Sequence, residues 1–337
     1  MSTIAALQTK DAYLSLSIVS EKTDQSSTSS VGSSSNAFGN AAISDTVTLS
    51  AKATAALADT TTTTTDPQVS YYAQFFPTRA GSSAIFGENV IDPAAATIST
   101  GLSASDIAKT ARASMDSEYS AMAASGKPFD YDSADGTDWY TLMSGLDRTA
   151  LAAVSSNQNG LFSTREQDMA QYVLLQQESL AAGSYSGPLD LKSKFVAQPV
   201  SGQDYSTATG NVPIGKYTNL NQSTLSFIEN ISLYLDKVGS YEKSTVGWAF
   251  DRASTQTSYE MAMDAANQPD DPKYISNLSI VRMLTDLMTN GQKLHLVNHP
   301  SVMSISDLLN EEWAKGHEAE ITNALKKTRE ALGYEQS

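Results

Sequence analysis

The sequence of 337 residues contains no cysteine. This absence excludes a disulfide-bonded scaffold, thiol catalysis, iron–sulfur clusters and cysteine-ligated zinc. Basic residues are also scarce, because 22 Lys and Arg stand against 37 Asp and Glu, and the formal net charge is −15. Proteins that bind nucleic acid or anionic lipid normally present a basic face to the phosphates. We therefore expect no nucleic-acid partner.

Long apolar runs are missing as well. No stretch approaches the roughly 18 consecutive apolar residues of a membrane-spanning helix, so we expect no membrane span. The first 20 residues have no basic start, no unbroken apolar core and no clear cleavage site, unlike a Sec signal peptide. We expect the protein to be cytoplasmic, or to be exported without a cleaved Sec signal peptide.

What the sequence does contain is enough apolar residues for a core, at 40% of the chain. The N-terminal part differs from the rest: residues 26–35 are nearly all Ser and Thr, and residues 60–65 are an unbroken threonine run. Such segments bury too little apolar surface to offset the entropy of ordering. We predict a low-complexity, largely disordered N-terminal segment over residues 1–66.

From residue 67 onward the pattern is helical. Ser103 and Ser163 each precede an acidic residue by three positions, which is typical of a capped helix start. Apolar spacing predicts helices after these two serines, over residues 147–157, 225–238 and 248–263, from Pro272 to Gly291, and over residues 304–332.

These elements predict a mainly α fold of irregular helical-bundle modules. Glycine and proline recur between residues 183 and 220 and prevent any long helix there. We therefore divide the chain into a helical module over residues 67–183, a Gly/Pro-rich connection over residues 184–220, and a C-terminal helical module over residues 221–337. The connection is either an interdomain linker or a long functional loop.

Two Asp-Arg dipeptides are the closest approach to an internal repeat. Asp147-Arg148 follows Trp139, and Asp251-Arg252 follows Trp248. The spacing from tryptophan to dipeptide differs between the two, so the sequence predicts no repeat.

Four aspartates in one short segment form a candidate calcium site: Asp130, Asp132, Asp135 and Asp138. Calcium prefers several carboxylate and carbonyl oxygens on a turn. The EF-hand spacing is off by one position and lacks the bidentate glutamate at its twelfth position. A solvated acidic turn, in which Asp138 caps a helix, is the alternative that we prefer.

An aromatic cluster follows the threonine run, formed by Tyr71, Tyr72, Phe75 and Phe76. The rings are paired at i and i+4 on a short helix that Pro67 opens. One interpretation is an anchoring helix that packs on the domain. The other is an exposed aromatic edge that binds a partner.

Patterns typical of catalytic or nucleotide-binding sites are incomplete. Gly210 and Lys216 have the spacing of a phosphate-binding loop, but tyrosine follows the lysine where Ser or Thr would hold magnesium. Ser240 and Lys243 have the S-x-x-K spacing of a serine acyl-transfer enzyme without its other elements. We assign no catalytic residue, no cofactor-binding residue and no cofactor other than the candidate calcium ion.

Residues 45–53 fit the short pattern D-x-V-x-L-S-x-x-A, carried by Asp45, Val47, Leu49, Ser50 and Ala53. This element resembles one in flagellar and flagellum-exported bacterial proteins, and in uncharacterised proteobacterial proteins with Ser-rich N-termini. The resemblance implies flagellum association or export, and it implies no site residue. The long terminal heptads of an axial filament subunit are missing.

The leading hypothesis is therefore a non-enzymatic, helical interaction or structural protein with a protein partner. A hydrolase that uses Asp or Glu in a cleft near residues 184–220 is one alternative, and a calcium-stabilised binding module is the other. The sequence leaves the oligomeric state open.

Overall fold

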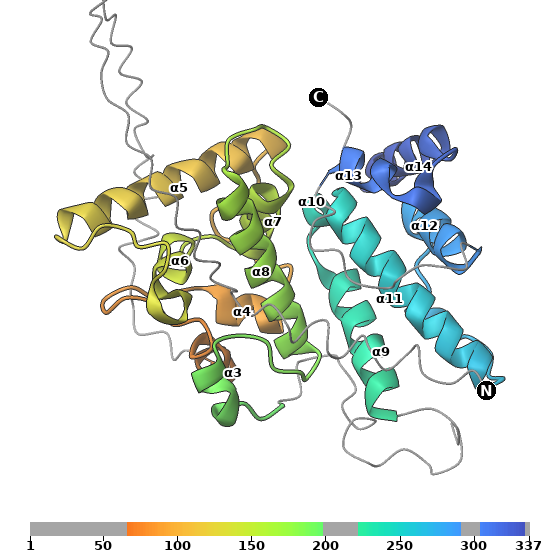
Figure 1. Ribbon diagram of the computed structural model, residues 1–337, viewed down its shortest axis with the longest axis horizontal. Coiled ribbons are helices and arrows are strands. Elements are labelled where there is room, and N and C mark those ends of the chain that lie inside the picture. The colour runs from red at the N-terminus through yellow and green to blue at the C-terminus, as the bar shows by residue number, and fades with distance from the viewer. Residues whose placement is uncertain (1–65, 198–221, 291–303, 334–337) are drawn as a thin grey trace, which may run out of the picture. The chain divides into compact units, whose positions relative to one another are not determined.

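The computed structural model describes residues 66–197, 222–290 and 304–333, and every regular element within these ranges is a helix (Figure 1). The prediction of a mainly α fold is confirmed. The α-helices are α3 (Pro67–Ala73), α4 (Phe86–Ile91), α5 (Ala104–Ala124), α6 (Thr137–Leu142), α7 (Arg148–Ser156), α8 (Thr164–Ala181), α9 (Gln222–Lys237), α10 (Ser240–Lys243), α11 (Val246–Ala265), α12 (Ser279–Asn290), α13 (Ile305–Asn310) and α14 (Glu318–Ala331). The 3₁₀ helices are η1 (Ala134–Gly136), η2 (Leu189–Lys194), η3 (Pro272–Tyr274) and η4 (Glu312–Ala314).

Several predictions fall on other parts of the chain. Residues 1–65, which hold the low-complexity segment and the pattern at residues 45–53, lie outside the described residues, as do residues 198–221. The described start of the predicted connection, residues 184–197, contains η2 and irregular backbone.

The helix starts predicted from capping patterns are confirmed. The Ser103 side chain caps α5. Ser163 and Glu166 form a reciprocal capping box at the start of α8, where the Glu166 carboxylate accepts from the Ser163 backbone N–H at 2.8 Å. Asp147 caps α7, which ends at Asn157 in the left-handed conformation. These signals lie within three residues in sequence, so they act without tertiary contacts.

The helix predicted from Pro272 to Gly291 is wrong at its start. Pro272 opens only the single turn of η3, and the chain is extended at Ile275. The α-helix α12 begins at Ser279. Proline suits the first turn of either helix type, so its presence does not predict that an α-helix continues.

The single helix predicted over residues 304–332 is also wrong. The segment is divided into α13, η4 and α14. Gly316 has a φ of +87°, a left-handed conformation that interrupts a right-handed helix. Trp313 therefore lies on η4, partly exposed, and stacks on Phe250 with ring centroids 6.3 Å apart.

None of the described helices can cross a membrane. The longest, α5 and α11, have 21 and 20 residues. A membrane span needs about 20 predominantly apolar residues, and no described helix is both long and apolar enough.

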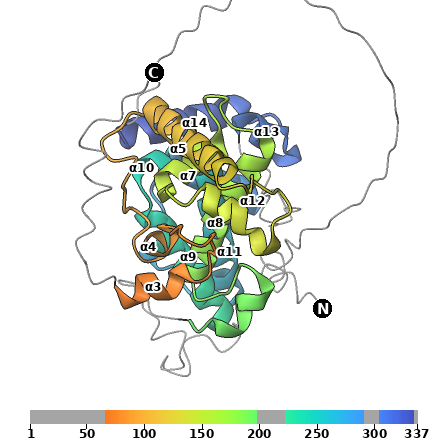
Figure 2. The same ribbon diagram turned by 90° about the vertical axis from the view of Figure 1, so that its left-hand side faces the viewer.

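The helices pack mainly against their neighbours in sequence (Figures 1 and 2). The most extensive contacts join α7 with α8 and α5, α11 with α12 and α9, α3 with α4, and α12 with α14. Further contacts join α8 with α9 and α7 with α10. The described parts of the two predicted modules therefore belong to one compact unit.

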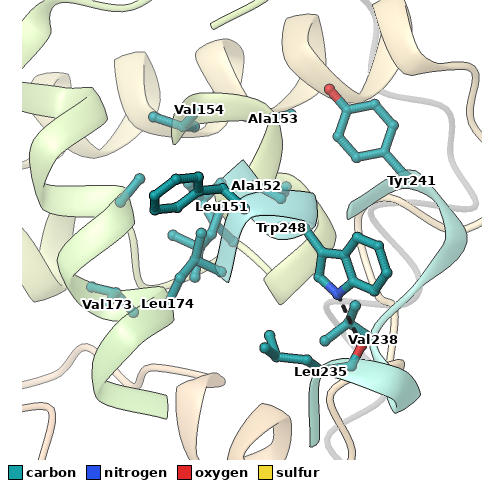
Figure 3. Packing of buried hydrophobic residues seen from close by; sticks show 14 of the residues in the cluster. Leu151, Ala152, Ala153, Val154, Val173, Leu174, Leu235, Val238, Tyr241 and Trp248 are labelled. Atoms are coloured by element: carbon teal, nitrogen blue, oxygen red, sulfur yellow. Dashed lines mark hydrogen bonds between the residues drawn. The ribbon is translucent and has the colours of Figure 1, made fainter. Parts of the chain in front are cut away.

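Apolar side chains from α7, α8, α9, α10 and α11 meet in the core (Figure 3). Trp248, only 3% exposed, lies among Tyr241, Val238 and Leu235. Its indole Nε1 donates to the Leu235 carbonyl oxygen at 3.0 Å. The one polar atom of the buried Trp248 side chain is therefore hydrogen-bonded, as a buried tryptophan requires.

Candidate functional site

Arg148, the first residue of α7, is buried with 1% of its surface exposed. Its Nε and Nη2 donate to the Glu242 carboxylate at 2.9 and 2.7 Å, and its Nη1 donates to the Leu174 carbonyl oxygen at 3.0 Å. Nη1 also contacts the Gln177 Oε1 at 3.2 Å and the Tyr234 hydroxyl at 3.1 Å. We call these five residues the Arg148 hub. Its guanidinium joins α7, α8, α9 and α10.

A second set of hydrogen bonds fixes the backbone around the Arg148 hub. The Arg148 N–H donates to the Asn89 Oδ1 at 3.1 Å, and the Tyr234 hydroxyl donates to the Asn89 carbonyl oxygen at 2.7 Å. The Asp147 carboxylate, which caps α7, also accepts from the backbone N–H groups of Thr97 and Ser99 at 2.7 and 3.0 Å. Loop residues before α5 and the α4 helix are therefore tied to the start of α7.

The charges of Arg148 and Glu242 stabilise each other in the hub. Burial opposes the charge of the guanidinium, but the Glu242 carboxylate outweighs this effect and raises the pKa of Arg148. Burial raises the pKa of Glu242, and Arg148 limits that rise. An arginine that donates two hydrogen bonds to one carboxylate forms a strong buried pair. The geometry of the pair therefore favours the charged forms of both groups.

A small cavity lies beside the Arg148 hub, and two further acids line it: Glu178 on α8 and Asp251 on α11. Glu178 is 1% exposed, and its Oε1 has no hydrogen-bond partner. The Ser156 hydroxyl, also on the lining, is buried without a partner. An unpaired buried polar atom costs about 1–3 kcal/mol, so these two atoms mark a place where the interior is incompletely satisfied.

Burial and mutual repulsion favour the neutral forms of both acids. Burial, followed by the charge of Asp251, raises the pKa of Glu178 well above its usual range. Burial, followed by the charge of Glu242, raises the pKa of Asp251 to about 7. The charge of Arg148 lowers the pKa values of Glu178 and Asp251, but it offsets their rise only in part, because its hydrogen-bond donors already bind Glu242.

The size of the cavity limits its chemistry. Its volume is about 20 Å³, on a scale on which one water molecule needs about 10–15 Å³. An organic substrate does not fit. No three His, Cys, Asp or Glu side chains among the described residues are arranged to hold a metal ion.

The four aspartates of the candidate calcium site do not form a ligand set in the described structure. Asp138 is buried and forms an ion pair with Arg79, and it accepts from the Asp130 backbone N–H at 2.8 Å. The Asp130 side chain accepts from the Asp132 backbone N–H at 3.0 Å, and Asp135 has a φ of +55°. Asp138 is the second residue of α6 and does not cap it, because Gly136 occupies the cap position.

Three rings of the candidate partner-binding cluster are buried. Tyr72 and Phe75 are 0% exposed and Phe76 is 2% exposed, while Tyr71 is partly exposed. Tyr71 donates its hydroxyl to the Val196 carbonyl oxygen at 2.7 Å. The buried rings therefore pack as the anchoring interpretation expects and do not form an exposed aromatic edge.

The hydrolase alternative places its acids near residues 184–220. The described part of that segment contains one acidic residue, Asp190, which is exposed on η2. Residues 198–220 lie outside the described residues. The acids that do converge, Glu178, Glu242 and Asp251, come from other elements.

One aromatic ring does lie at the surface. Tyr131 is 52% exposed, and its ring packs edge-to-face on Phe129 and Trp139 with centroids 5.0 and 5.7 Å away. The Arg165 guanidinium, itself exposed, lies 5.1 Å from the Tyr131 ring centroid. We call these four residues the Tyr131 surface.

Sequence reasoning missed both the Arg148 hub and the Tyr131 surface. One local signal for the hub exists: a cation in the first turn of a helix opposes the helix dipole, and Arg148 is followed by a run of apolar residues. For Tyr131 the sequence contains no pattern that predicts an exposed ring, and it shows only that the residue lies among the aspartates.

Comparisons with known protein families, with curated proteins and with solved structures find no match to this chain.

Proposed function

We propose that this is a non-enzymatic helical protein that acts by binding another protein. The observation that carries the proposal is the small size of the space between the converging charged groups. Arg148, Glu178, Glu242 and Asp251 line a cavity with room for about one water. Charged groups that hold helices together in the interior stabilise the fold. The binding function is therefore proposed to lie on the surface.

The Tyr131 surface is the proposed contact region. Its exposed members are Tyr131 and Arg165, and tyrosine and arginine are among the residues most enriched in positions that dominate binding energy. Trp139 donates its Nε1 to the Tyr131 backbone carbonyl oxygen at 3.1 Å, and its ring packs against the Tyr131 ring, so the tyrosine is held in place before a partner arrives. A ring that is already ordered loses little side-chain entropy on binding.

Charge indicates what kind of partner fits. Asp130 and Asp132 are exposed on either side of Tyr131, and the whole chain carries a net charge of −15. A segment rich in Lys and Arg matches this field, and its cations can also stack on the aromatic ring. The proposed partner is therefore a protein with a basic segment.

Site-specific photocrosslinking in the cells that produce the protein tests this proposal. A photoreactive phenylalanine analogue replaces Tyr131 in one variant and Met261, a residue of α11 that is 50% exposed, in the control. We expect a discrete adduct from position 131 whose crosslinked peptide is rich in Lys and Arg, with a lower yield in an Asp132→Asn background. No adduct, or the same adducts from position 261, would contradict the proposal.

The proposed location is the cytoplasm or the cell exterior, reached by a route that does not cut a Sec signal. The flagellum-like pattern at Asp45, Val47 and Leu49 motivates the export route. Fractionation of cells with and without a working flagellar export apparatus tests it. Secretion that is equal in both strains would refute flagellar export.

A further inference from the structure

The cavity beside the Arg148 hub contains more negative than positive groups. Arg148 from α7 faces three carboxyls, from Glu178 on α8, Glu242 on α10 and Asp251 on α11, and the Tyr234 phenol from α9 adds no cation. Glu242 takes both Nε and Nη2 of the guanidinium. Two carboxyls therefore have no cation of their own among the described residues that line the cavity.

The neighbouring cations are engaged elsewhere. Lys243 donates its Nζ to the Asp236 carbonyl oxygen at 2.6 Å, and its charge acts on Glu242. Arg252 forms a two-point ion pair with Asp236 at 2.8 and 2.9 Å. Neither compensates Glu178 or Asp251. The three carboxyls are not arranged to hold a metal ion, since no group of three His, Cys, Asp or Glu side chains among the described residues has that geometry.

We propose that this cavity is a proton-binding site, in which protons held by Glu178 on α8 and Asp251 on α11 keep the elements that line it together beside the Arg148 hub. Two observations carry the proposal: the unpartnered Glu178 Oε1 inside the cavity, and the excess of carboxyls over cations around it. Room for about one water gives the neutral carboxyls a hydrogen-bonding partner. Asp251 is partly exposed, which provides a path for protons to and from solvent.

Loss of the protons changes the energy of the site. Two carboxylates next to Glu242 repel each other, and the interior screens that repulsion poorly. Arg148 cannot neutralise them without giving up Glu242. The contact between the elements that line the cavity is therefore expected to loosen as the pH rises through the neutral range.

The first experiment is an infrared titration of the folded full-length protein from pH 5 to pH 9. Ordinary Asp and Glu side chains are ionised at pH 6, so a protonated-carboxyl band at that pH reports shifted groups. We expect the Asp251 part of this band to disappear with a midpoint near 7, and the band to be weaker in both Glu178→Gln and Asp251→Asn. Asp190→Asn, at an exposed site on η2, is the matched control and is expected to leave the band unchanged.

The second experiment follows amide hydrogen exchange in residues 246–252 of α11 at pH 6 and pH 8, corrected for the intrinsic rate. The parent protein is expected to lose at least about tenfold protection at pH 8, while the double variant Glu178→Gln with Asp251→Asn loses less than about threefold. A wild-type band that vanishes below pH 5 would overturn the proposal even if the variants fail to fold. So would equal loss of protection in the double variant and the parent.

Discussion

Replacing Arg148 with methionine removes the only guanidinium in the hub and keeps much of its side-chain volume. The variant leaves the Glu242 carboxyl buried without its partner, along with the Leu174 carbonyl and the Gln177 side chain that Arg148 also served. Truncating one member of a buried ion pair costs about 3–5 kcal/mol, because the other charge stays behind.

The magnitude can be worked from Glu242. Once Arg148 is gone, this carboxyl must take up a proton to remain buried. Holding a glutamate neutral at pH 7, against an unfolded pKa of about 4.3, costs about 3.7 kcal/mol. At pH 5 the same cost falls to about 1 kcal/mol. We therefore expect Arg148→Met to lower the free energy of unfolding by about 4–5 kcal/mol at pH 7 and by about 3 kcal/mol less at pH 5.

A double variant separates the charge effect from packing. Arg148→Met with Glu242→Leu removes both charges, so no carboxyl has to be neutralised. We expect the pair to recover at least about 2 kcal/mol of the loss at pH 7. Arg165→Met, at the exposed arginine of the Tyr131 surface, is the control and is expected to change stability by less than about 0.5 kcal/mol.

The assay is urea unfolding of each variant at pH 5 and pH 7, followed by circular dichroism. Tryptophan fluorescence provides a second probe, to which Trp248 contributes because its ring packs beside the hub elements. The reasoning fails if Arg148→Met costs less than about 1 kcal/mol at pH 7, or if the double variant is less stable than the single one.

Three further predictions rest on other contacts. Gly87→Ala is expected to lower the free energy of unfolding in urea by about 1–3 kcal/mol, because a Cβ there would lie 2.6 Å from a backbone oxygen of α3. Gly145→Ala is the control and should cost much less, because its Cβ would meet only a serine hydroxyl at 3.3 Å. Ser163→Ala is expected to cost about 1 kcal/mol and to fray the start of α8, measured by amide exchange. The hydrogen bond from Arg79 lowers the pKa of Asp138, so its carboxylate stabilises the fold above the ordinary pKa and loses this effect as the pH falls through the lowered value. Asp138→Asn is therefore expected to flatten the loss of stability below about pH 4, and an unchanged acid limb in urea titrations would contradict that account.

How far the sequence predicts this fold depends on the range of the interaction. The caps at Ser103 and Ser163 are read from residues three positions apart, and both are confirmed; the helix predicted from Asp147 also starts there, with Asp147 as its cap. The end of α7 at Asn157 is similarly local. Helix existence and most boundaries of α5, α7, α8, α9 and α11 follow from such signals and from apolar spacing.

Breaks inside a helical pattern were harder to predict. Trp313, Ile321 and Leu325 have the spacing of one apolar stripe, but the left-handed Gly316 separates the tryptophan from the other two. A glycine within a helix costs only about 1 kcal/mol, so its presence does not decide between a tolerated residue and a break. Packing of Trp313 on Phe250 is a tertiary contact that the spacing does not contain.

The candidate site lay beyond sequence reasoning for the same reason. Arg148 and Glu242 are 94 residues apart, and neither belongs to a motif. Glu178 and Asp251 are two of 37 acids, and no spacing in the sequence shows that they line one cavity.

The two Asp-Arg dipeptides show how position in an element sets the role of identical residues. Asp147 and Arg148 lie at the cap and first residue of α7, so the acid binds backbone N–H groups and the arginine enters the hub. Asp251 and Arg252 lie inside α11, where successive side chains point about 100° apart.

Within α11 the arginine therefore turns away from the acid beside it. Arg252 pairs with Asp236 on α9, while Asp251 lines the cavity next to Glu178. The Asp251-Arg252 dipeptide carries no net charge, but only its acidic side chain lines the cavity. That separation is the physical origin of the uncompensated charge of Asp251, and Glu178 on α8 supplies the second acid that has no cation of its own.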